Sequence, residues 1–284
     1  MTQLDYTVRT MTRQELDIAV GWAAAEGWNP GRYDADSFYA ADPTGFLIGY
    51  LGNEPIASIS AVKYGDSFGF IGFYIVRPEY RGRGYGLQIW NAAMAYLSGR
   101  TVGLDGVLAQ QENYQKSGFT LAYRNIRYQG TGGGVRPTDS NLVPLSTIPF
   151  DEVCAYDQPF FHDNRTSFLK SWISQPESIA LGVLGTDGRL AGYGVIRPCQ
   201  SGFKIGPLFA DSPQLAEDLF LALKTGAPNE APVFLDIPEV NPAALELVQR
   251  HTMVSMFETA RMYTQTCAAL PVNRLFGVTS FELG

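Results

Sequence analysis

The sequence predicts an α+β protein of two tandem domains, each a mixed, mostly antiparallel sheet flanked by helices. The chain has 284 residues, enough for two domains of about 140 residues each. In the first half, one strand, a helix and three strands precede alternating helices and strands, which is not a strict βαβ order. A similar order follows in the second half, so an internal repeat of the fold is expected.

Local signals justify the elements of the first half. Alternation over residues 6–9 predicts a strand. Thr12 and Glu15 form a capping box for a helix that ends at Gly27, and Asp34 is expected to cap a short second helix. The later elements are a hairpin turning at GNEP, a third long strand ending at Arg77-Pro78, a helix beginning near Tyr85, a strand in RTVGLDGVLA, a short helix in QENYQKSGF and a strand in TLAYRNIRYQG.

Glycine, proline and polar residues are concentrated in residues 130–142, which makes this segment the expected linker. It separates an N-terminal domain, residues 1–129, from a C-terminal domain, residues 143–284. The elements expected in the second half are a helix in FLKSWISQ, a hairpin turning at TDGR, a strand in GFKIGPLFAD, a helix capped by Ser212 and started by Pro213, a strand in PVFLDIP, a helix opened by Asn241-Pro242 and a last strand in VSMFETARMYTQ.

Composition excludes several classes of function. The net charge of −7 argues against a general nucleic-acid binder, since that affinity comes mainly from Lys and Arg. Cys154, Cys199 and Cys267 lie far apart, a usage typical of a reducing cytosol, and with only His162 and His251 a histidine-rich metal site is not expected. The first residues lack a signal-peptide pattern, and no apolar stretch approaches the ~20 residues that span a bilayer. The sequence therefore predicts a cytoplasmic protein without a nucleic-acid, membrane or metal partner, and it leaves the oligomeric state open.

The segment EYRGRGYG, residues 79–86, carries the main chemical signal. Its three alternating glycines leave backbone N–H groups unshielded at the start of a helix, where the helix dipole is positive. Such a turn can bind a phosphate or diphosphate through main-chain donors, and Arg81 and Arg83 add positive charge. The spacing is neither GxGxxG nor a loop ending in GK[ST], so neither a Rossmann nor a P-loop interpretation fits.

Two segments resemble motifs of the GCN5-related N-acetyltransferases (GNAT). YIVRPEYRGRGYG resembles motif A, and ENYQKSGF resembles motif B. The motifs come in the family's order, separated by a helix and a strand, and the resemblance covers about residues 6–128. The matching positions are Tyr74, Val76, Pro78, Arg81, Gly84 and Gly86 in motif A, and Asn113, Tyr114, Gly118 and Phe119 in motif B.

The resemblance implies a site for acetyl-coenzyme A (acetyl-CoA) as co-substrate. In the family, the loop holds the diphosphate and the main chain of the preceding strand bonds the pantetheine arm. The residues expected to bind the coenzyme are Tyr74, Ile75, Val76, Arg81, Gly82, Arg83, Gly84, Tyr85, Gly86 and Asn113. The second half resembles a degenerate GNAT-like domain, as in two-domain bacterial members, because IGPLFADSPQ lacks the Arg-x-x-Gly-x-Gly signature. That half would close the substrate cleft or would only stabilise the first.

Acetyl transfer to an amine requires a neutral amine, donors for the oxyanion and an acid for the leaving thiolate. Main-chain N–H groups near Val76 could serve the oxyanion, and Tyr114 matches the family position that supplies the acid. Asp105 and Glu26 are alternative general bases, since a carboxylate within an apolar strand is unusual and Glu26 ends the first helix. His162 could also reach the cleft from the second domain.

The acceptor site is less well specified. Trp28, Asn29 and Asp42 are candidates to bind an amine, with Phe46 as an apolar wall. The expected function is acetyl-CoA-dependent N-acetylation of a primary amine, in a small molecule or a peptide, by direct attack on the thioester. The alternatives are a catalytically silent acyl-CoA sensor and an O-acyl or aminoacyl transferase. The intact motif residues favour an enzyme, but no residue names the acceptor.

Overall fold

The structure is a computed structural model that describes residues 5–138, 140–267 and 269–284. The first half begins with a strand, continues through two helices and a three-strand meander, and ends on a long strand. Its elements are β1 (Tyr6–Thr10), α1 (Arg13–Ala25), α2 (Asp34–Ala41), β2 (Phe46–Leu51), β3 (Glu54–Tyr64), β4 (Phe68–Val76), α3 (Tyr85–Tyr96), β5 (Thr101–Val107), α4 (Gln111–Lys116) and β6 (Thr120–Thr131).

The second half repeats this order with two helices ahead of its meander. Its elements are β7 (Leu142–Pro144), α5 (Phe150–Asp157), α6 (Thr166–Trp172), β8 (Ile179–Leu184), β9 (Leu190–Pro198), β10 (Phe203–Ala210), α7 (Pro213–Lys224), β11 (Pro232–Pro238), α8 (Pro242–Arg250), β12 (Val254–Tyr263) and β13 (Leu275–Gly277). The sequence did not predict β7, α5 or β13. The expected caps Thr12, Ser212 and Asn241 are confirmed.

Asp34 differs from the expectation of a helix cap, because Tyr33 holds that position and Asp34 is the first residue of α2. The Asp34 side chain turns into the protein instead. Its Oδ2 accepts a hydrogen bond from the Gly31 amide at 2.7 Å, and its Oδ1 accepts one from Arg197 Nε at 2.7 Å. A partner distant in the sequence therefore overrides the local capping signal.

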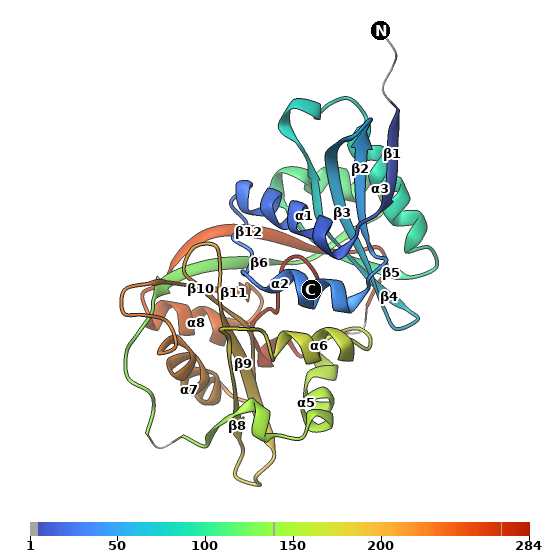
Figure 1. Ribbon diagram of the computed structural model, residues 1–284. Coiled ribbons are helices and arrows are strands. Elements are labelled where there is room, and N and C mark those ends of the chain that lie inside the picture. The colour runs from blue at the N-terminus through green and yellow to red at the C-terminus, as the bar shows by residue number, and fades with distance from the viewer. Residues whose placement is uncertain (1–4, 139, 268) are drawn as a thin grey trace.

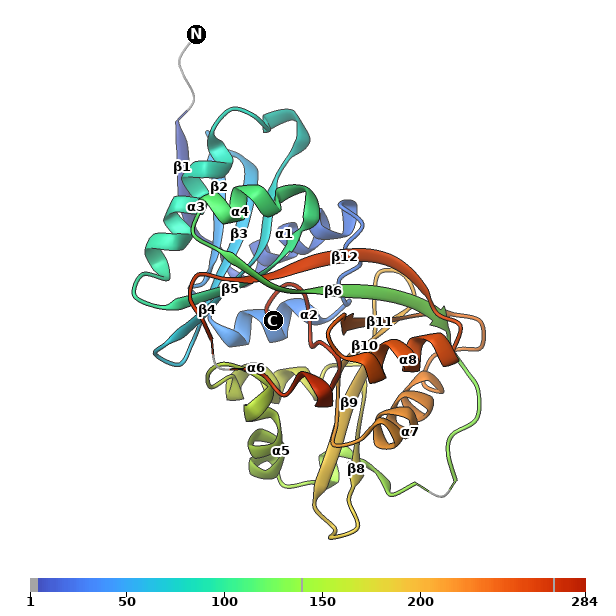
Figure 2. The same ribbon diagram turned by 180° about the vertical axis from the view of Figure 1, so that it is seen from behind.

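One sheet of 13 strands runs through both halves (Figure 1). Its order is β1-β2-β3-β4-β5-β12-β6-β11-β10-β9-β8-β7, and β13 pairs with β10. Only β4–β5 and β10–β11 are parallel among the described pairs, so the predicted α+β class with mostly antiparallel strands is confirmed. In Figure 2, α3 and α4 lie on one side of the first half, and α7 and α8 lie on the same side of the second.

The two halves exchange one strand each. β12, from the end of the chain, pairs with β5 and separates it from β6. In return β6 pairs with β11 of the second half. Figure 1 shows β12 and β6 crossing the middle of the molecule side by side. The sheet of each half is therefore completed by a strand that belongs to the other half in the sequence.

Three buried ion pairs join the halves. In each, a residue before position 130 pairs with one after position 190, and no side chain of the six is more than 5 % exposed. Breaking such a pair leaves an unpaired internal charge, which typically costs about 3–5 kcal/mol. The pairs are Asp34–Arg197 at 2.7 Å, Arg127–Asp236 at 2.7 Å and Asp105–Arg261 at 2.6 Å.

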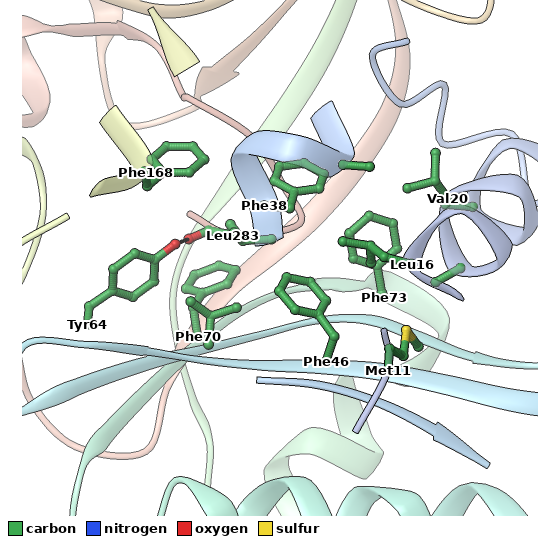
Figure 3. Packing of buried hydrophobic residues seen from close by; sticks show 14 of the residues in the cluster. Met11, Leu16, Val20, Phe38, Phe46, Tyr64, Phe70, Phe73, Phe168 and Leu283 are labelled. Atoms are coloured by element: carbon green, nitrogen blue, oxygen red, sulfur yellow. Dashed lines mark hydrogen bonds between the residues drawn. The ribbon is translucent and has the colours of Figure 1, made fainter. Parts of the chain in front are cut away.

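The last residues of the chain pack into the core of the first half. Figure 3 shows Leu283 beside Phe38 and Phe70, and the Tyr64 hydroxyl donates to the Leu283 carbonyl at 3.1 Å. A Cβ on Gly72 of β4 would lie 2.0 Å from the Glu282 carbonyl oxygen. Glycine is therefore required at position 72 for the C-terminal segment, residues 278–284, to lie against β4.

A half-buried histidine lies in the same region. The His162 ring contacts the rings of Phe68 and Tyr263, at centroid distances of 4.9 and 5.1 Å. Its Nε2 has no hydrogen-bond partner among the residues described. Burial, and secondarily the positive charge of Arg261, lowers the pKa of His162 to about 4. The folded protein therefore holds this imidazole neutral.

We predict that protonation of His162 destabilises the fold. Its folded pKa of about 4 is below the ordinary value of 6.5, so the unfolded chain takes up the proton first as the pH falls. The contribution of the neutral His162 to the free energy of unfolding is fully present above pH 6.5. It is lost progressively toward pH 4, by up to about 3 kcal/mol. Urea unfolding of the wild type and of His162→Phe between pH 7 and 4 measures this difference. Parallel pH curves for the two proteins would contradict the prediction.

Candidate active site

β4 and β5 separate part-way along their length and leave an opening in the sheet. They pair only where Phe68–Ile71 lies opposite Thr101–Leu104, although both strands continue further. Phe73 has a φ of 46°, and the β3–β4 register shifts beside it, so β4 bends away at a bulge. A cavity of about 470 Å³ lies in this opening, lined by both strands and by the C-terminal segment. Among the expected residues it reaches Tyr74, Ile75 and Val76.

The glycine loop lies at the mouth of this cavity and leads into α3. Gly82 and Gly84 have φ values of 74° and 83°, a conformation that glycine tolerates best, and their Cα hydrogens face open space. Within the described chain, the amide N–H groups of residues 82–86 have no backbone or side-chain acceptor. Gly82, Gly84 and Gly86 all line the cavity. These free donors at a helix N-terminus form an anion-binding geometry.

Arg81 and Glu26 form an ion pair across the cavity mouth. Arg81 Nε donates to the Val76 carbonyl at 2.7 Å, and Arg81 Nη2 donates to Glu26 Oε1 at 2.5 Å. Both side chains are partly exposed and both line the cavity. An anion at the loop would therefore meet Arg81 in competition with the Glu26 carboxylate.

The other expected coenzyme contacts do not line the cavity. Arg83 is exposed and lies over the Tyr80 ring at 5.8 Å. Tyr85 packs against Tyr6, with ring centroids 4.8 Å apart. Asn113 is exposed and donates through Nδ2 to Gln110 Oε1 at 2.7 Å.

Tyr114 projects from α4 into the cavity wall. Its ring packs beside Trp90, at a centroid distance of 5.7 Å, and over β5 at Gly106, where a Cβ would lie 2.3 Å from the tyrosine ring. Burial, with a smaller effect of Tyr74, raises the pKa of Tyr114 well above its ordinary value. The phenol therefore stays protonated at neutral pH and is able to donate a proton.

Asp105 lines the cavity but is engaged by other protein groups. Arg261 Nε donates to Asp105 Oδ1 at 2.9 Å and Arg261 Nη2 to Oδ2 at 2.6 Å. Asn125 adds a hydrogen bond to Oδ1 at 2.8 Å. This bidentate, fully buried pair accounts for a carboxylate in an apolar strand, because it links β5 to the exchanged strand β12.

Only one of the four proposed acceptor residues reaches the cavity. Trp28 lines it, whereas Asn29 clips the halves together through hydrogen bonds to the Ser201 backbone at 2.8 and 2.9 Å. Asp42 accepts hydrogen bonds from the Tyr96 hydroxyl and the Lys63 amide, outside the cavity wall. Phe46 is fully buried in the core shown in Figure 3. His162, the further candidate from the second domain, also lies outside the cavity wall.

The structure adds residues that sequence reasoning missed. Four come from the second half: Phe257 and Thr259 on β12, and Phe281 and Glu282 on the C-terminal segment. They reach the first half only because β12 is exchanged and the C-terminal segment folds back. Nothing in a local pattern signals that placement, although a glutamate within the apolar run FELG is an unusual feature.

The corresponding opening in the second half is filled by the chain itself. β10 and β11 pair only over Phe203–Ile205 and Val233–Leu235. Beyond this point β13 pairs with β10 at Leu208 and Phe209. Only residues 211–212 separate β10 from α7, compared with residues 77–84 between β4 and α3. The second half thus has neither an open slot nor a glycine loop at this place.

Separated parallel strands with a glycine loop at their mouth define a GNAT-type acyltransferase. The chain belongs to the GNAT superfamily as a two-domain member. Residues 12–119 match the model described as "Acetyltransferase (GNAT) family", and residues 153–277 match one described as "Acetyltransferase (GNAT) domain". The predicted resemblance of both halves is confirmed.

A relative of similar length supports this assignment, and two solved structures share the fold. The holothin acyltransferase of Pseudoalteromonas sp. (strain SANK 73390) is 30% identical over 279 residues, which cover 98% of this chain and 95% of that protein. A Pyrococcus horikoshii protein described as a candidate acetyltransferase superposes with a TM-score of 0.81 at 24% identity, covering 100% and 97% of the two chains. A tandem GNAT protein from the clavulanic acid biosynthesis pathway gives 0.64 at 13% identity, covering 93% and 99%. At these identities the two solved structures show the fold alone.

Three further observations concern metal, membrane and thiol chemistry. Among residues 5–138, 140–267 and 269–284, no group of three or more His, Cys, Asp or Glu side chains is arranged to hold a metal ion. None of the helices in the same ranges is both long and apolar enough to cross a bilayer. Cys154, Cys199 and Cys267 are free thiols.

We predict that Gly84→Glu weakens acetyl-CoA binding by at least 100-fold. The new carboxylate would stand among the free loop amides and repel a diphosphate. Gly188 is a matched control, since its φ of 80° and open surroundings resemble the 83° and open surroundings of Gly84. Both Glu variants should lose about 1–2 kcal/mol of stability to backbone strain, but only Gly84→Glu should lose affinity in calorimetry. Equal affinity of the two variants would refute the loop assignment.

We predict that Glu26→Gln leaves kcat within twofold and tightens acetyl-CoA binding. Freed from Glu26, Arg81 would meet the diphosphate without competition. A partly exposed ion pair is worth about 0.2–1 kcal/mol, so the gain in affinity should not exceed about fivefold. Steady-state kinetics and calorimetry measure the two effects. A fall in kcat of more than tenfold would instead support Glu26 as the general base.

Proposed function

We propose that this GNAT acyltransferase is an acetyl-CoA-dependent N-acetyltransferase that transfers the acetyl group to a primary amine by direct attack. The observation that carries the proposal is the alignment of free amides at residues 82–86 with the opening between β4 and β5. The free amides suit a diphosphate, and the opening suits an extended thioester arm. The three free thiols agree with a cytoplasmic location, which belongs to the same proposal.

The coenzyme would bind in an extended form through the mouth of the cavity. Its diphosphate would accept hydrogen bonds from the loop amides, with Arg81 as the nearest cation. The pantetheine arm would then follow β4 over residues 74–76, since this stretch of the strand has no pairing with β5. The thioester would then lie near Tyr114, which lines the same cavity.

The reaction joins the amine nitrogen to the acetyl carbon and breaks the carbon–sulfur bond. A neutral amine attacks the carbonyl and forms a tetrahedral oxyanion, which main-chain N–H groups of β4 near Val76 would stabilise. As the intermediate collapses, the thiolate leaves and takes a proton from the Tyr114 hydroxyl. The Tyr114 phenol is protonated at neutral pH, and because burial raises its pKa, it would give up the proton only as negative charge develops on the sulfur.

Acetyl-CoA is the proposed donor, and a primary amine is the proposed acceptor. The relative named holothin acyltransferase supports transfer of an acyl group to an acceptor. It leaves the acyl chain open, so acetyl-, propionyl- and butyryl-CoA should be compared as donors. The amine acceptor is supported by the intact motif residues and by the lining of the cavity, which includes Glu282.

We predict that Tyr114→Phe lowers kcat by at least 100-fold and leaves acetyl-CoA affinity within twofold. Loss of a general acid typically costs 10²–10⁴ in rate. Tyr123→Phe is the matched control, since Tyr123 is also a tyrosine with a buried hydroxyl but lies outside the cavity wall. Thiol release with a panel of primary amines measures the rate.

Thermal shift with acetyl-CoA tests the coenzyme site independently of turnover. At 100 times its Kd, the ligand should add about 2.7 kcal/mol to stability. No shift would refute the proposed function altogether. A clear shift with no thiol release from any amine would favour a silent acyl-CoA sensor over an enzyme.

A further inference from the structure

Four residues from the second half of the chain line the cavity, and we call them its inner wall. Phe257 and Thr259 project from β12, and Phe281 and Glu282 come from the C-terminal segment. Trp28 of the first half lines the same cavity. The cavity therefore combines a loop suited to phosphate at its mouth with three aromatic rings and two polar side chains from residues that motif A and motif B do not include.

Two of these side chains lack the partners that buried polar groups normally have. Glu282 is 3% exposed and its Oε2 has no hydrogen-bond partner among the residues described. Thr259 is 2% exposed and its Oγ1 has none either. Most buried polar atoms in folded proteins are satisfied, so two unsatisfied ones on residues of one cavity wall make Glu282 and Thr259 candidates to bind a polar ligand.

Glu282 belongs to a buried group of charged side chains that includes Arg127, Arg197 and Lys204. Burial and the nearby Arg127 lower the pKa of Lys204, while Asp236 and Glu282 oppose that shift. Arg197, paired with Asp34, also feels the charge of Glu282. The group contains three cations. Its carboxylates are Asp34, Asp236 and Glu282, so the charges are equal in number if Glu282 is counted as an anion. The carboxylate is thus balanced electrostatically, although Oε2 has no direct partner.

The cations themselves are already committed to other acceptors. Arg127 donates to Asp236 through Nε and Nη2, each at 2.7 Å, and to the Trp28 carbonyl at 2.6 Å. Lys204 donates to the Asn29 carbonyl at 3.0 Å. Their engagement leaves Glu282 available to a donor that enters the cavity.

We propose that Glu282 binds the ammonium group of the acceptor and takes its proton, so that the C-terminal segment forms the acceptor site. This inference rests on the proposed N-acetyltransferase function and names the base and the acceptor class for it. Trp28, Phe257 and Phe281 would hold a small apolar or aromatic body, and the Thr259 hydroxyl would give a second polar contact. The acceptor class is a small primary amine with an apolar body.

The proton balance is complete with the groups named. Glu282 accepts one proton from the ammonium, and the neutral amine attacks the acetyl carbon. The carbon–sulfur bond breaks as Tyr114 protonates the thiolate. The second proton lost by the nitrogen restores the Tyr114 phenol, and Glu282 releases its proton to solvent. The products are the amide, the free thiol of the coenzyme and one proton.

The packing behind Glu282 limits the size of the acceptor that we propose. Every residue from 275 to 284 is buried, and the Glu282 backbone lies against Gly72 of β4. The wall is therefore solid, and an acceptor has to fit within the part of the 470 Å³ cavity that the acetyl-pantetheine arm leaves free.

The test compares Glu282→Gln with the wild type, using 2-phenylethylamine, tyramine and tryptamine as acceptors and a lysine-containing peptide as a large comparison. Glu258→Gln is the matched control. Glu258 lies between the cavity residues Phe257 and Thr259 on β12, but it pairs with Arg124 and does not line the cavity. We expect Glu282→Gln to lose at least 100-fold in kcat/KM at pH 7, while acetyl-CoA affinity stays within twofold. Glu258→Gln should behave as the wild type does.

The pH profile separates a base from a merely structural carboxylate. The wild-type rate should reach a plateau near neutral pH, whereas the Glu282→Gln rate should rise about tenfold per pH unit toward the pKa of the free amine. A structural counter-ion would instead lower the melting temperature on substitution and leave the shape of the profile unchanged. That result, or turnover of the peptide in preference to the small amines, would overturn the inference.

The failures of the two proposals are distinguishable. If the wild type binds acetyl-CoA and acetylates an amine, but Glu282→Gln matches it in rate and profile, the acceptor-site inference is wrong and the proposed function stands. If the wild type binds acetyl-CoA but turns over none of the small amines, the inference is also wrong. If the wild type does not bind acetyl-CoA, the proposed function itself is refuted.

Discussion

The exchange of β6 and β12 is the constraint on which the rest of the structure depends. With β12 beside β5, Arg261 reaches Asp105, and the buried pair fixes one wall of the cavity. With β6 beside β11, Arg127 reaches Asp236 and also holds the Trp28 carbonyl. The hydrogen bonds of the sheet and the desolvated ion pairs therefore act together, because neither pair could form without the crossed strands.

Because of the exchange, the two halves supply different parts of the site. The first half supplies the loop, the separated strands and Tyr114, all within one stretch of sequence. The second half has a short turn and a self-filled slot where the first half has a glycine loop, and it contributes the inner wall instead. Of the two copies of the fold, the first therefore carries the glycine loop, and the second contributes side chains that line the cavity.

The parts of the structure that could be predicted from sequence are those whose physical cause is local. The caps at Thr12, Ser212 and Asn241 depend on residues within three positions, and the glycine loop combines conformation and charge in a few consecutive residues. The α+β class followed from the order of the elements. Asp105 was identified as an unusual buried carboxylate, but its partner Arg261 lies 156 residues further along the chain.

The inner wall could not be predicted for the same reason. Thr259 and Glu282 reach the cavity through strand exchange and through the packing of Leu283 among aromatic rings, and neither leaves a periodic or spacing signal. The acceptor candidates chosen from sequence illustrate the limit. Asn29 is polar and Phe46 is apolar, as an acceptor site would require. In the structure, however, Asn29 forms hydrogen bonds between the two halves, and Phe46 lies in the hydrophobic core.

Strand crossing has a consequence for how the molecule can be divided. The covalent connection between β6 and β7 covers only residues 132–141, while the two fragments on either side share a continuous ladder and three internal ion pairs. A protease nick in that connection would leave both pieces bound to each other. The chain is thus a natural candidate for a split-protein design, in which co-expressed fragments reassemble and neither is a free-standing unit.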